Sequence, residues 1–196
     1  SKKPNPARVI KKHKLKDKII LLLPATLHKL KNQNLAINSL DKVLQEFPNC
    51  VLILVGEGSD KERLKKLVAQ KGLEKNVIFA GVAKNEEIAD YYKAAHLVLV
   101  PSYLSEGLPI VPFEALYLSV FSLVAKGSGV DKILKKEGIG QVVSPNPIDF
   151  SQAILTYLRQ PKKFEMLKRK GKHWVKKNLN PEKFTETNIR IYKNLI

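Results

Sequence analysis

The sequence predicts an α/β fold, a Rossmann-like domain of three layers in which a parallel sheet of about six strands carries helices on both faces, followed by C-terminal helices. Short apolar runs alternate along the chain with stretches whose apolar residues recur at helical spacing. Apolar runs of this length are typical of strands that are buried on both faces, as in a parallel sheet. The length of 196 residues suits one such domain.

Each of the first three predicted strands ends at a residue that interrupts regular structure. The first run ends at Pro24, the second at Gly56–Gly58 and the third at Gly81. Glycine and proline at these points indicate turns. In chain order, the strands are predicted at residues 19–23, 51–55, 77–79, 97–100, 121–125 and 141–143.

Between the strands, apolar residues recur three or four positions apart, as they do on one face of a helix. Ser59 is placed to cap one of these helices. Helices are predicted around residues 35–44, 59–68, 88–92 and 110–118, after the turn at 127–129, and from 149 onward with breaks at Pro161 and Pro181. In sheets of this type, ligands bind outside the carboxyl ends of the strands, so the loops after the first five strands are the expected site.

The beginning of the chain differs in composition from the rest. Residues 1–18 are rich in lysine and contain Pro4 and Pro6. We expect them to form a basic linker or arm, and we expect residues 19–196 to form the domain. The start of the chain has no signal-peptide pattern, and no apolar run approaches the ~18 residues of a membrane span.

The charge and the cysteine content limit the classes of partner. The chain carries 35 Lys and Arg against 18 Asp and Glu, a formal net charge of +17, which predicts attraction to an anionic partner. Five of the basic residues are arginines, and the aromatic residues do not interleave with the basic ones as a nucleic-acid stacking surface requires. We therefore expect no specific nucleic-acid partner, and a basic nucleic-acid-binding module remains the less favoured alternative. Cys50 is the only cysteine, which fits a reducing compartment and excludes a cysteine-based metal site.

The strongest local signal lies where the fourth strand gives way to a helix. Residues 102–115 read SYLSEGLPIVPFEA, with Glu106 in the loop and Glu114 about two turns into the predicted helix. Pro109 suits the first position of a helix. The free amides of a first helical turn and the helix dipole favour a phosphate. The segment therefore predicts a phosphate-binding helix start with two carboxylates that face one pocket.

This segment resembles the E-x7-E signature of retaining glycosyltransferases of family 4. Those enzymes have the GT-B fold, which consists of two Rossmann-like domains, and the C-terminal domain binds the nucleotide sugar. The resemblance extends over residues 19–196. It includes the strand and Gly-acid-Gly turn at 51–58, the strand at 77–81, the strand and Pro-Ser pair at 98–102, and the tail around Pro181, Phe184 and Tyr192. By resemblance, residues 19–196 are a donor-binding domain, and an N-terminal acceptor domain is absent from this chain.

The resemblance also implies roles for individual residues. Glu106 is the implied catalytic residue, bonding to hydroxyls of the donor sugar, and Glu114 would accept both ribose hydroxyls. Lys31 would neutralise the diphosphate, backbone amides of the helix start would bind it, Gly56 and Gly58 would permit close backbone approach, and Val82 would contact the base. The implied donor-binding set is Lys31, Gly56, Gly58, Val82, Gly107, Leu108, Ile110, Val111 and Glu114.

The chain departs from the family pattern at the first strand. A Gly-Arg pair usually follows that strand, and here the corresponding residues are Ala25 and Thr26. The phosphate-binding arginine is thus missing, and Thr26, His28 and Lys29 are the candidate phosphate contacts in its place. Other departures are Ser119 for a glycine, Phe121 for a proline, Ser128 in a Gly-Gly turn and Lys132 for a glutamate. They motivate the alternative of a degenerate domain that binds nucleotide sugar without catalysis.

The resemblance implies that the full enzyme transfers a sugar, with retention, from a nucleotide-diphospho-sugar to an acceptor hydroxyl. Surface polysaccharide, glycolipid or lipid-linked glycan synthesis is the implied setting, and this chain alone is expected to be inactive. GT-B enzymes generally stabilise the leaving group with basic side chains and helix amides, so no tightly bound metal and no other cofactor are expected. The expected location is cytoplasmic, with peripheral attachment to the anionic inner face of the cytoplasmic membrane as a further hypothesis.

Overall fold

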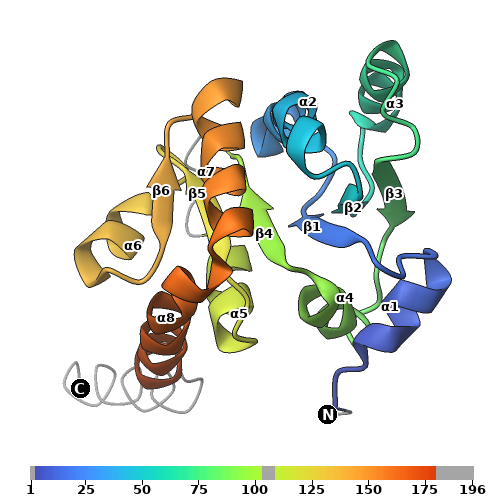
Figure 1. The fold of residues 1–196 in the computed structure, drawn as a ribbon. Coiled ribbons are helices and arrows are strands. Elements are labelled where there is room, and N and C mark those ends of the chain that lie inside the picture. The colour runs from blue at the N-terminus through green and yellow to red at the C-terminus, as the bar shows by residue number, and fades with distance from the viewer. Residues whose placement is uncertain (1–2, 103–108, 180–196) are drawn as a thin grey trace, which may run out of the picture.

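The computed structural model describes residues 3–102 and 109–179, and within these ranges it contains one six-stranded sheet (Figure 1). All neighbouring strands are parallel, and their order is β3-β2-β1-β4-β5-β6. The strands are β1 (Ile19–Pro24), β2 (Cys50–Val55), β3 (Val77–Gly81), β4 (Leu97–Val100), β5 (Ser122–Ala125) and β6 (Gln141–Val143). The predicted fold class is confirmed.

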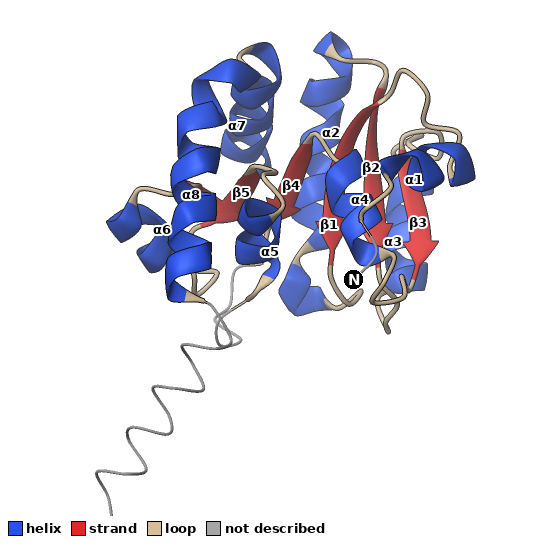
Figure 2. Ribbon diagram, turned by 90° about the horizontal axis from the view of Figure 1, so that it is seen from below, coloured by secondary structure: helices blue, strands red, loops and turns tan. Residues whose placement is uncertain are grey.

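Helices cover both faces of this sheet, as Figures 1 and 2 show. The helices on one face are α2 (Gln33–Glu46), α3 (Lys61–Gln70) and α7 (Pro147–Arg159). The other face carries α1 (Pro6–Lys12), α4 (Ile88–Ala94), α5 (Val111–Tyr117), α6 (Asp131–Glu137) and α8 (Glu165–Asn178). Short 3-10 turns precede α2 (η1, Lys29–Lys31) and α8 (η2, Pro161–Phe164).

Successive strand residues enter the two cores in alternation, which explains the uninterrupted apolar runs. In β1, Leu21 and Leu23 pack with the helices of the first face, whereas Ile20 and Leu22 pack with those of the second. All four side chains are at most 2% exposed. A strand in the middle of a parallel sheet needs apolar side chains on both sides, because each face is covered by helices.

The structure corrects the expectation of an irregular arm over residues 1–18. Residues 6–12 form α1, which packs on α4 and buries Val9. Asn5 caps this helix, its backbone N–H donates to the Asp90 carboxylate at 2.5 Å, and Pro6 stands in the first turn. An asparagine cap followed by proline is a known helix start. Val9 and Leu15, both 3% exposed, supply the apolar contact that the many lysines obscure in the sequence.

One smaller expectation also differs from the structure. The capping position of α3 is Asp60 rather than Ser59, and Asp60 makes a two-bond contact with Arg63. That contact holds the pKa of the Asp60 carboxyl below its usual value, because the guanidinium stabilises the charged form. Among the helices that the structure describes, none is long and apolar enough to cross a membrane.

Candidate functional site

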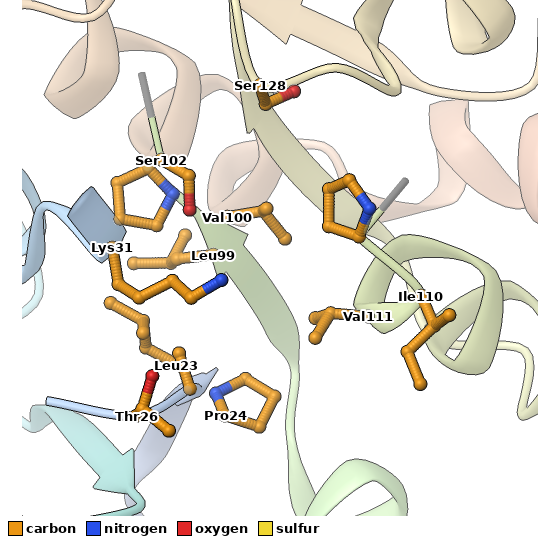
Figure 3. Close-up of a pocket in the computed structure, with 13 residues that line it drawn as sticks. Leu23, Pro24, Thr26, Lys31, Leu99, Val100, Ser102, Ile110, Val111 and Ser128 are labelled. Atoms are coloured by element: carbon orange, nitrogen blue, oxygen red, sulfur yellow. The ribbon is translucent and has the colours of Figure 1, made fainter. Parts of the chain in front are cut away.

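A cavity of about 510 Å³ opens at the carboxyl ends of β1 and β4 (Figure 3). The chain leaves β1 toward β2 on one side of the sheet, whereas β4 continues toward β5 on the other, so the strand order reverses at this point. Ligands of open α/β sheets bind at such a reversal. The walls are Leu23, Pro24, Ala25, Thr26, Lys31, Leu99, Val100, Pro101, Ser102, Pro109, Ile110, Val111 and Ser128.

Among the described residues that line the cavity, Lys31 is the one that carries a positive charge. Its side chain points toward the centre of the cavity in Figure 3. It ends the η1 turn, and Asn32 follows in the left-handed conformation at φ 51°. The Asn32 amide donates to the Pro101 carbonyl at 3.2 Å, which ties the loop after β1 to the loop after β4. The Gln33 amide donates to the Thr26 carbonyl at 2.8 Å. These two bonds hold Lys31 and Thr26 at the mouth of the sheet.

Two buried serines in the cavity wall were not found by sequence reasoning. Ser102 follows β4 and is 7% exposed, and Ser128 lies in the turn after β5 and is 1% exposed. Among the described residues, none is a hydrogen-bond partner of the Ser128 hydroxyl. Buried polar groups are normally paired, so an unpaired hydroxyl at a cavity indicates a position for a ligand or a water. Small hydroxyl residues carry no distinctive spacing, and the fold was needed to bring them to the cavity.

The predicted helix start is present, but it begins later than the sequence suggested. The first residue of α5 is Val111, Pro112 lies in its first turn, and the amides of Phe113 and Glu114 donate to the Ile110 carbonyl. The prediction that Pro109 takes the first helical position is therefore wrong. Ile110 and Val111 do line the cavity, as expected of the helix start. Glu106, Gly107 and Leu108 lie outside the described residues.

Glu114 lies in the first turn of α5, not two turns into it, and it does not line the cavity with Lys31. It lines an adjoining groove of about 510 Å³ between α4, α5 and α8. Ile110, which is 62% exposed, belongs to the walls of both depressions. The groove is otherwise formed by Ile88, Ala89, Tyr92, Phe113, Tyr117, Leu118, Val175 and Leu179. Glu114 is thus the acidic member of an apolar groove that meets the cavity at Ile110.

Tyr92 of α4 is the polar partner of that carboxylate. Its hydroxyl donates to Glu114 Oε2 at 2.6 Å, and the tyrosine is 1% exposed. Burial, and then the neighbouring carboxylate, raise the pKa of the Tyr92 phenol far above its ordinary value. The hydroxyl therefore keeps its proton, and Glu114 is the acceptor of this bond.

The structure does not bring the other predicted contacts to the cavity. Lys29 and His28 lie outside its walls, and His28 Nδ1 accepts from the Leu30 amide at 3.4 Å as a cap of η1. Val82, which is 72% exposed after β3, also lies outside both depressions. Within the described ranges, no three His, Cys, Asp or Glu side chains gather closely enough to hold a metal ion.

Gly56 and Gly58 permit a close backbone approach within the chain, whereas the expected approach was to the donor. A Cβ on Gly56 would lie 2.1 Å from the Ala25 carbonyl oxygen, and one on Gly58 would lie 2.3 Å from the Leu27 carbonyl oxygen. Real Cβ atoms do not approach so closely, because the atoms would overlap. Neither glycine lines the cavity. Their close backbone approach is to the loop after β1, which they support from behind.

Comparison with known proteins gives consistent matches over the whole described domain. The model of the family "Glycosyl transferases group 1" matches residues 7–174. Human alpha-1,3/1,6-mannosyltransferase ALG2 is 26% identical over 193 residues, which cover 91% of this chain and 46% of that protein. The chain therefore spans about half the length of this relative.

Solved structures share the fold. HepE from Anabaena, solved in complex with UDP, superposes with a TM-score of 0.82 at 20% identity, covering 97% of this chain and 52% of that one. The C-terminal domain of the group 1 protein LpcC from Francisella tularensis superposes with a TM-score of 0.78 at 22% identity. That comparison covers 90% of this chain and 94% of the LpcC domain, so the chain corresponds in extent to a single domain.

Proposed function

The chain belongs to the group 1 glycosyl transferases, and from that premise we propose that it is the domain that holds the nucleotide-sugar donor. The observation that carries this proposal is the cavity at the reversal of strand order, with Lys31 on one wall and the start of α5 on the other. A cation and a helix start are suited to a diphosphate. The hydroxyls of Thr26, Ser102 and Ser128 add hydrogen-bonding groups to the same walls.

In the proposed reaction, the bond between the anomeric carbon of the sugar and the diphosphate oxygen breaks, and a bond to an acceptor hydroxyl forms with retention. The nucleoside diphosphate leaves with the bonding electrons, and its leaving oxygen takes the proton that the acceptor hydroxyl loses. Lys31 would stabilise the charge that develops on the leaving oxygen, an effect that is strong in a partly dry site. The acceptor, a sugar or lipid-linked glycan, would be bound by the N-terminal domain that the family resemblance implies. The chain spans 46% of its human relative.

For the nucleoside, we propose that the bound nucleotide extends from the cavity past Ile110 into the groove. Its ribose would lie in the groove and contact Glu114. Ile110 lines both depressions, so a ligand that fills one and enters the other must pass it. Val82 would contact the base, and Glu106 would bind the donor sugar. The apolar walls of the groove suit the carbon skeleton of a nucleoside better than they suit a phosphate.

Isothermal titration calorimetry with UDP, GDP and ADP tests this proposal on the 196-residue chain. We expect a single site with a dissociation constant in the micromolar to millimolar range for at least one nucleotide, and little turnover of nucleotide sugars. Absence of binding by all three at millimolar concentration would contradict the proposal. A degenerate, non-catalytic domain predicts the same binding, and it differs only if the full-length protein transfers no sugar.

Thr26 offers a test by gain of affinity. It is exposed, it lines the cavity and it stands where the family resemblance places an arginine. Thr26→Arg is expected to tighten binding of the nucleoside diphosphate about tenfold, because a guanidinium makes two charge-assisted bonds to phosphate. Calorimetry measures the change.

The control for Thr26→Arg is Gln70→Arg, which adds the same charge at an exposed position of α3. Equal gains from both variants would mean that net charge and not the cavity attracts the nucleotide. A loss of affinity with Thr26→Arg would place the diphosphate elsewhere.

We further propose that a basic face of α6 and α8 attaches the enzyme to an anionic membrane surface. The two helices lie side by side in Figures 1 and 2, and a Cβ on Gly138 after α6 would lie 3.1 Å from Lys170 Nζ of α8. The face is mainly lysine, and Met166 projects from it at 80% exposure. The exposed basic residues of the two helices are Lys132, Lys135, Lys136, Arg169, Lys170, Lys176 and Lys177.

Vesicle sedimentation tests this attachment. The quadruple change of Lys136, Lys170, Lys176 and Lys177 to glutamine is expected to weaken binding to vesicles containing phosphatidylglycerol at least tenfold, because each lysine near such a surface contributes about 1 kcal/mol. The matched control changes Lys42, Lys65, Lys66 and Lys75, which lie on or beside α2 and α3. Equal losses in the two quadruple variants, or no preference of the wild type for anionic vesicles, would contradict this face.

A further inference from the structure

Three consecutive residues of α4 connect the N-terminal helix to the groove of Glu114. Asp90 accepts from the Asn5 amide at 2.5 Å and lies 3.7 Å from the Arg8 guanidinium. The Tyr91 hydroxyl is 2.9 Å from His13 Nε2. Tyr92, the next residue, donates to Glu114 Oε2 of α5 at 2.6 Å. The helix that carries the Tyr92 hydroxyl is thus also anchored to the N-terminal segment that contains α1.

The Tyr92 side chain is itself held in place. It is 1% exposed and packs in the core with the strands and helices of the second face. A tyrosine ring has two rotatable side-chain bonds, so burial of the ring leaves its hydroxyl at a defined point. The bond to Glu114 joins α4 to the first turn of α5, the segment that also supplies Ile110 and Val111 to the cavity.

The Glu114 carboxylate has two oxygens and several acceptor positions. Among the described residues, the Tyr92 hydroxyl is the hydrogen-bond donor to its side chain, and it uses Oε2. Glu114 is partly exposed and lines the groove, so Oε1 remains for a ligand. A carboxylate with one oxygen tied down presents the other in one orientation, whereas an untied carboxylate must lose rotational freedom when the ligand binds.

We propose that Tyr92 is a positioning residue that orients Glu114 so that the second carboxylate oxygen accepts from the hydroxyls of a nucleotide ribose. This inference rests on the proposed function, since it takes Glu114 as the ribose contact. Tyr92 does not touch the ribose in this arrangement, and it acts only through Glu114. Its loss therefore affects the discrimination between ribose and deoxyribose more than it affects the binding of the diphosphate.

The test compares a nucleoside diphosphate with its 2′-deoxy form, using UDP and 2′-deoxy-UDP, or the guanine pair if GDP binds better. Calorimetry gives the ratio of the two dissociation constants for each variant of the chain. We expect a wild-type ratio of at least about ten, because the deoxy ligand loses a hydrogen bond to the charged Glu114 carboxylate, and such bonds contribute ~1.5–3 kcal/mol. Glu114→Ala is expected to bring the ratio close to one.

Tyr92→Phe is expected to lower the ratio at least threefold in the wild-type background and to leave it unchanged in the Glu114→Ala background. Tyr91→Phe is the matched control, because Tyr91 is the neighbouring buried tyrosine and its hydroxyl bonds to α1 instead. It is expected to keep the wild-type ratio. A purely structural bond between α4 and α5 would lower the melting temperature of Tyr92→Phe without changing the ratio. Tyr92→Met serves as a second variant without the hydroxyl if Tyr92→Phe does not fold, since methionine adapts to irregular space.

The outcomes separate this inference from the proposed function. If the wild type binds none of the nucleotides, both are overturned. If the wild type and Glu114→Ala behave as expected but Tyr92→Phe keeps the wild-type ratio, only the role of Tyr92 is overturned. A wild-type ratio near one would contradict ribose recognition by Glu114 and, with it, the role of Tyr92. Donor binding in the cavity would not be contradicted by that result.

Discussion

Lys31→Met is expected to weaken the binding of a nucleoside diphosphate about 10- to 100-fold, because a hydrogen bond to a charged group contributes ~1.5–3 kcal/mol. Lys31 points into the cavity from η1, and methionine keeps the length of its side chain without the charge. Binding of the nucleoside without phosphates is expected to change less than about twofold, since the lost interaction is electrostatic. Calorimetry with UDP and uridine, or with the guanine pair, measures both effects.

Lys29→Met is the control for Lys31→Met. Lys29 belongs to the same 3-10 turn, is exposed and does not line the cavity. It removes the same charge two positions away, so long-range attraction changes equally in the two variants. Similar losses for both lysines would show that the cavity does not hold the diphosphate. A loss that is equally large for the free nucleoside would point to a distorted site.

Gly58→Ala is expected to lower the free energy of unfolding by about 2–4 kcal/mol, because a new Cβ would overlap backbone atoms that cannot move independently. The Leu27 carbonyl oxygen would lie 2.3 Å from that Cβ, and the Leu27 carbonyl carbon and amide nitrogen would lie 2.8 and 2.9 Å away. The loop after β1 would have to shift, and Thr26 and Lys31 would move with it. Urea unfolding and a nucleotide titration of the same sample measure the two consequences.

Gly72→Ala separates steric overlap from backbone strain. Gly72 has φ +66°, and a Cβ there would meet nothing within 4 Å. Its cost is expected to be about 1 kcal/mol, from the left-handed backbone alone, with nucleotide binding unchanged. If Gly58→Ala is no more destabilising than Gly72→Ala, the loop after β1 shifts to accommodate the new Cβ more easily than its contacts indicate.

The sheet was predictable from the sequence because its strands are buried on both faces. In a chain of this charge, continuous apolar runs such as Leu21–Leu23 indicate strands that are buried on both faces. Each predicted run lies close to a strand of the structure. The helix α1 escaped prediction because one buried valine and one buried leucine among lysines give no periodic signal. Its position depends on Asp90, which is 85 residues from Asn5 in the chain.

The site was predictable to the extent that it follows from strand ends. Lys31, Thr26, Ile110 and Val111 come to one cavity because β1 and β4 are neighbours in the sheet. Side-chain direction was not predictable in this way. The sequence placed Glu114 about two turns into a helix, whereas α5 starts only three residues before it. The groove that Glu114 lines and its hydrogen bond with Tyr92 could therefore not be inferred.

The roles of Gly56 and Gly58 show a related limit. A glycine in a loop indicates close approach, but the sequence does not say whether the approaching atoms belong to a ligand or to the chain. Here they are the Ala25 and Leu27 carbonyls. The resemblance to glycosyltransferases identified the family, and the structure was needed to separate residues that line the cavity from residues that support it.

A crystal structure of the chain with the bound nucleoside diphosphate tests the central claim most directly. The diphosphate is expected between the Lys31 amine and the backbone amides of Ile110 and Val111, with the ribose hydroxyls against the Glu114 carboxylate beyond Ile110. A nucleotide found on the lysines of α8, or bound in the cavity with its ribose directed away from Glu114, would contradict the account.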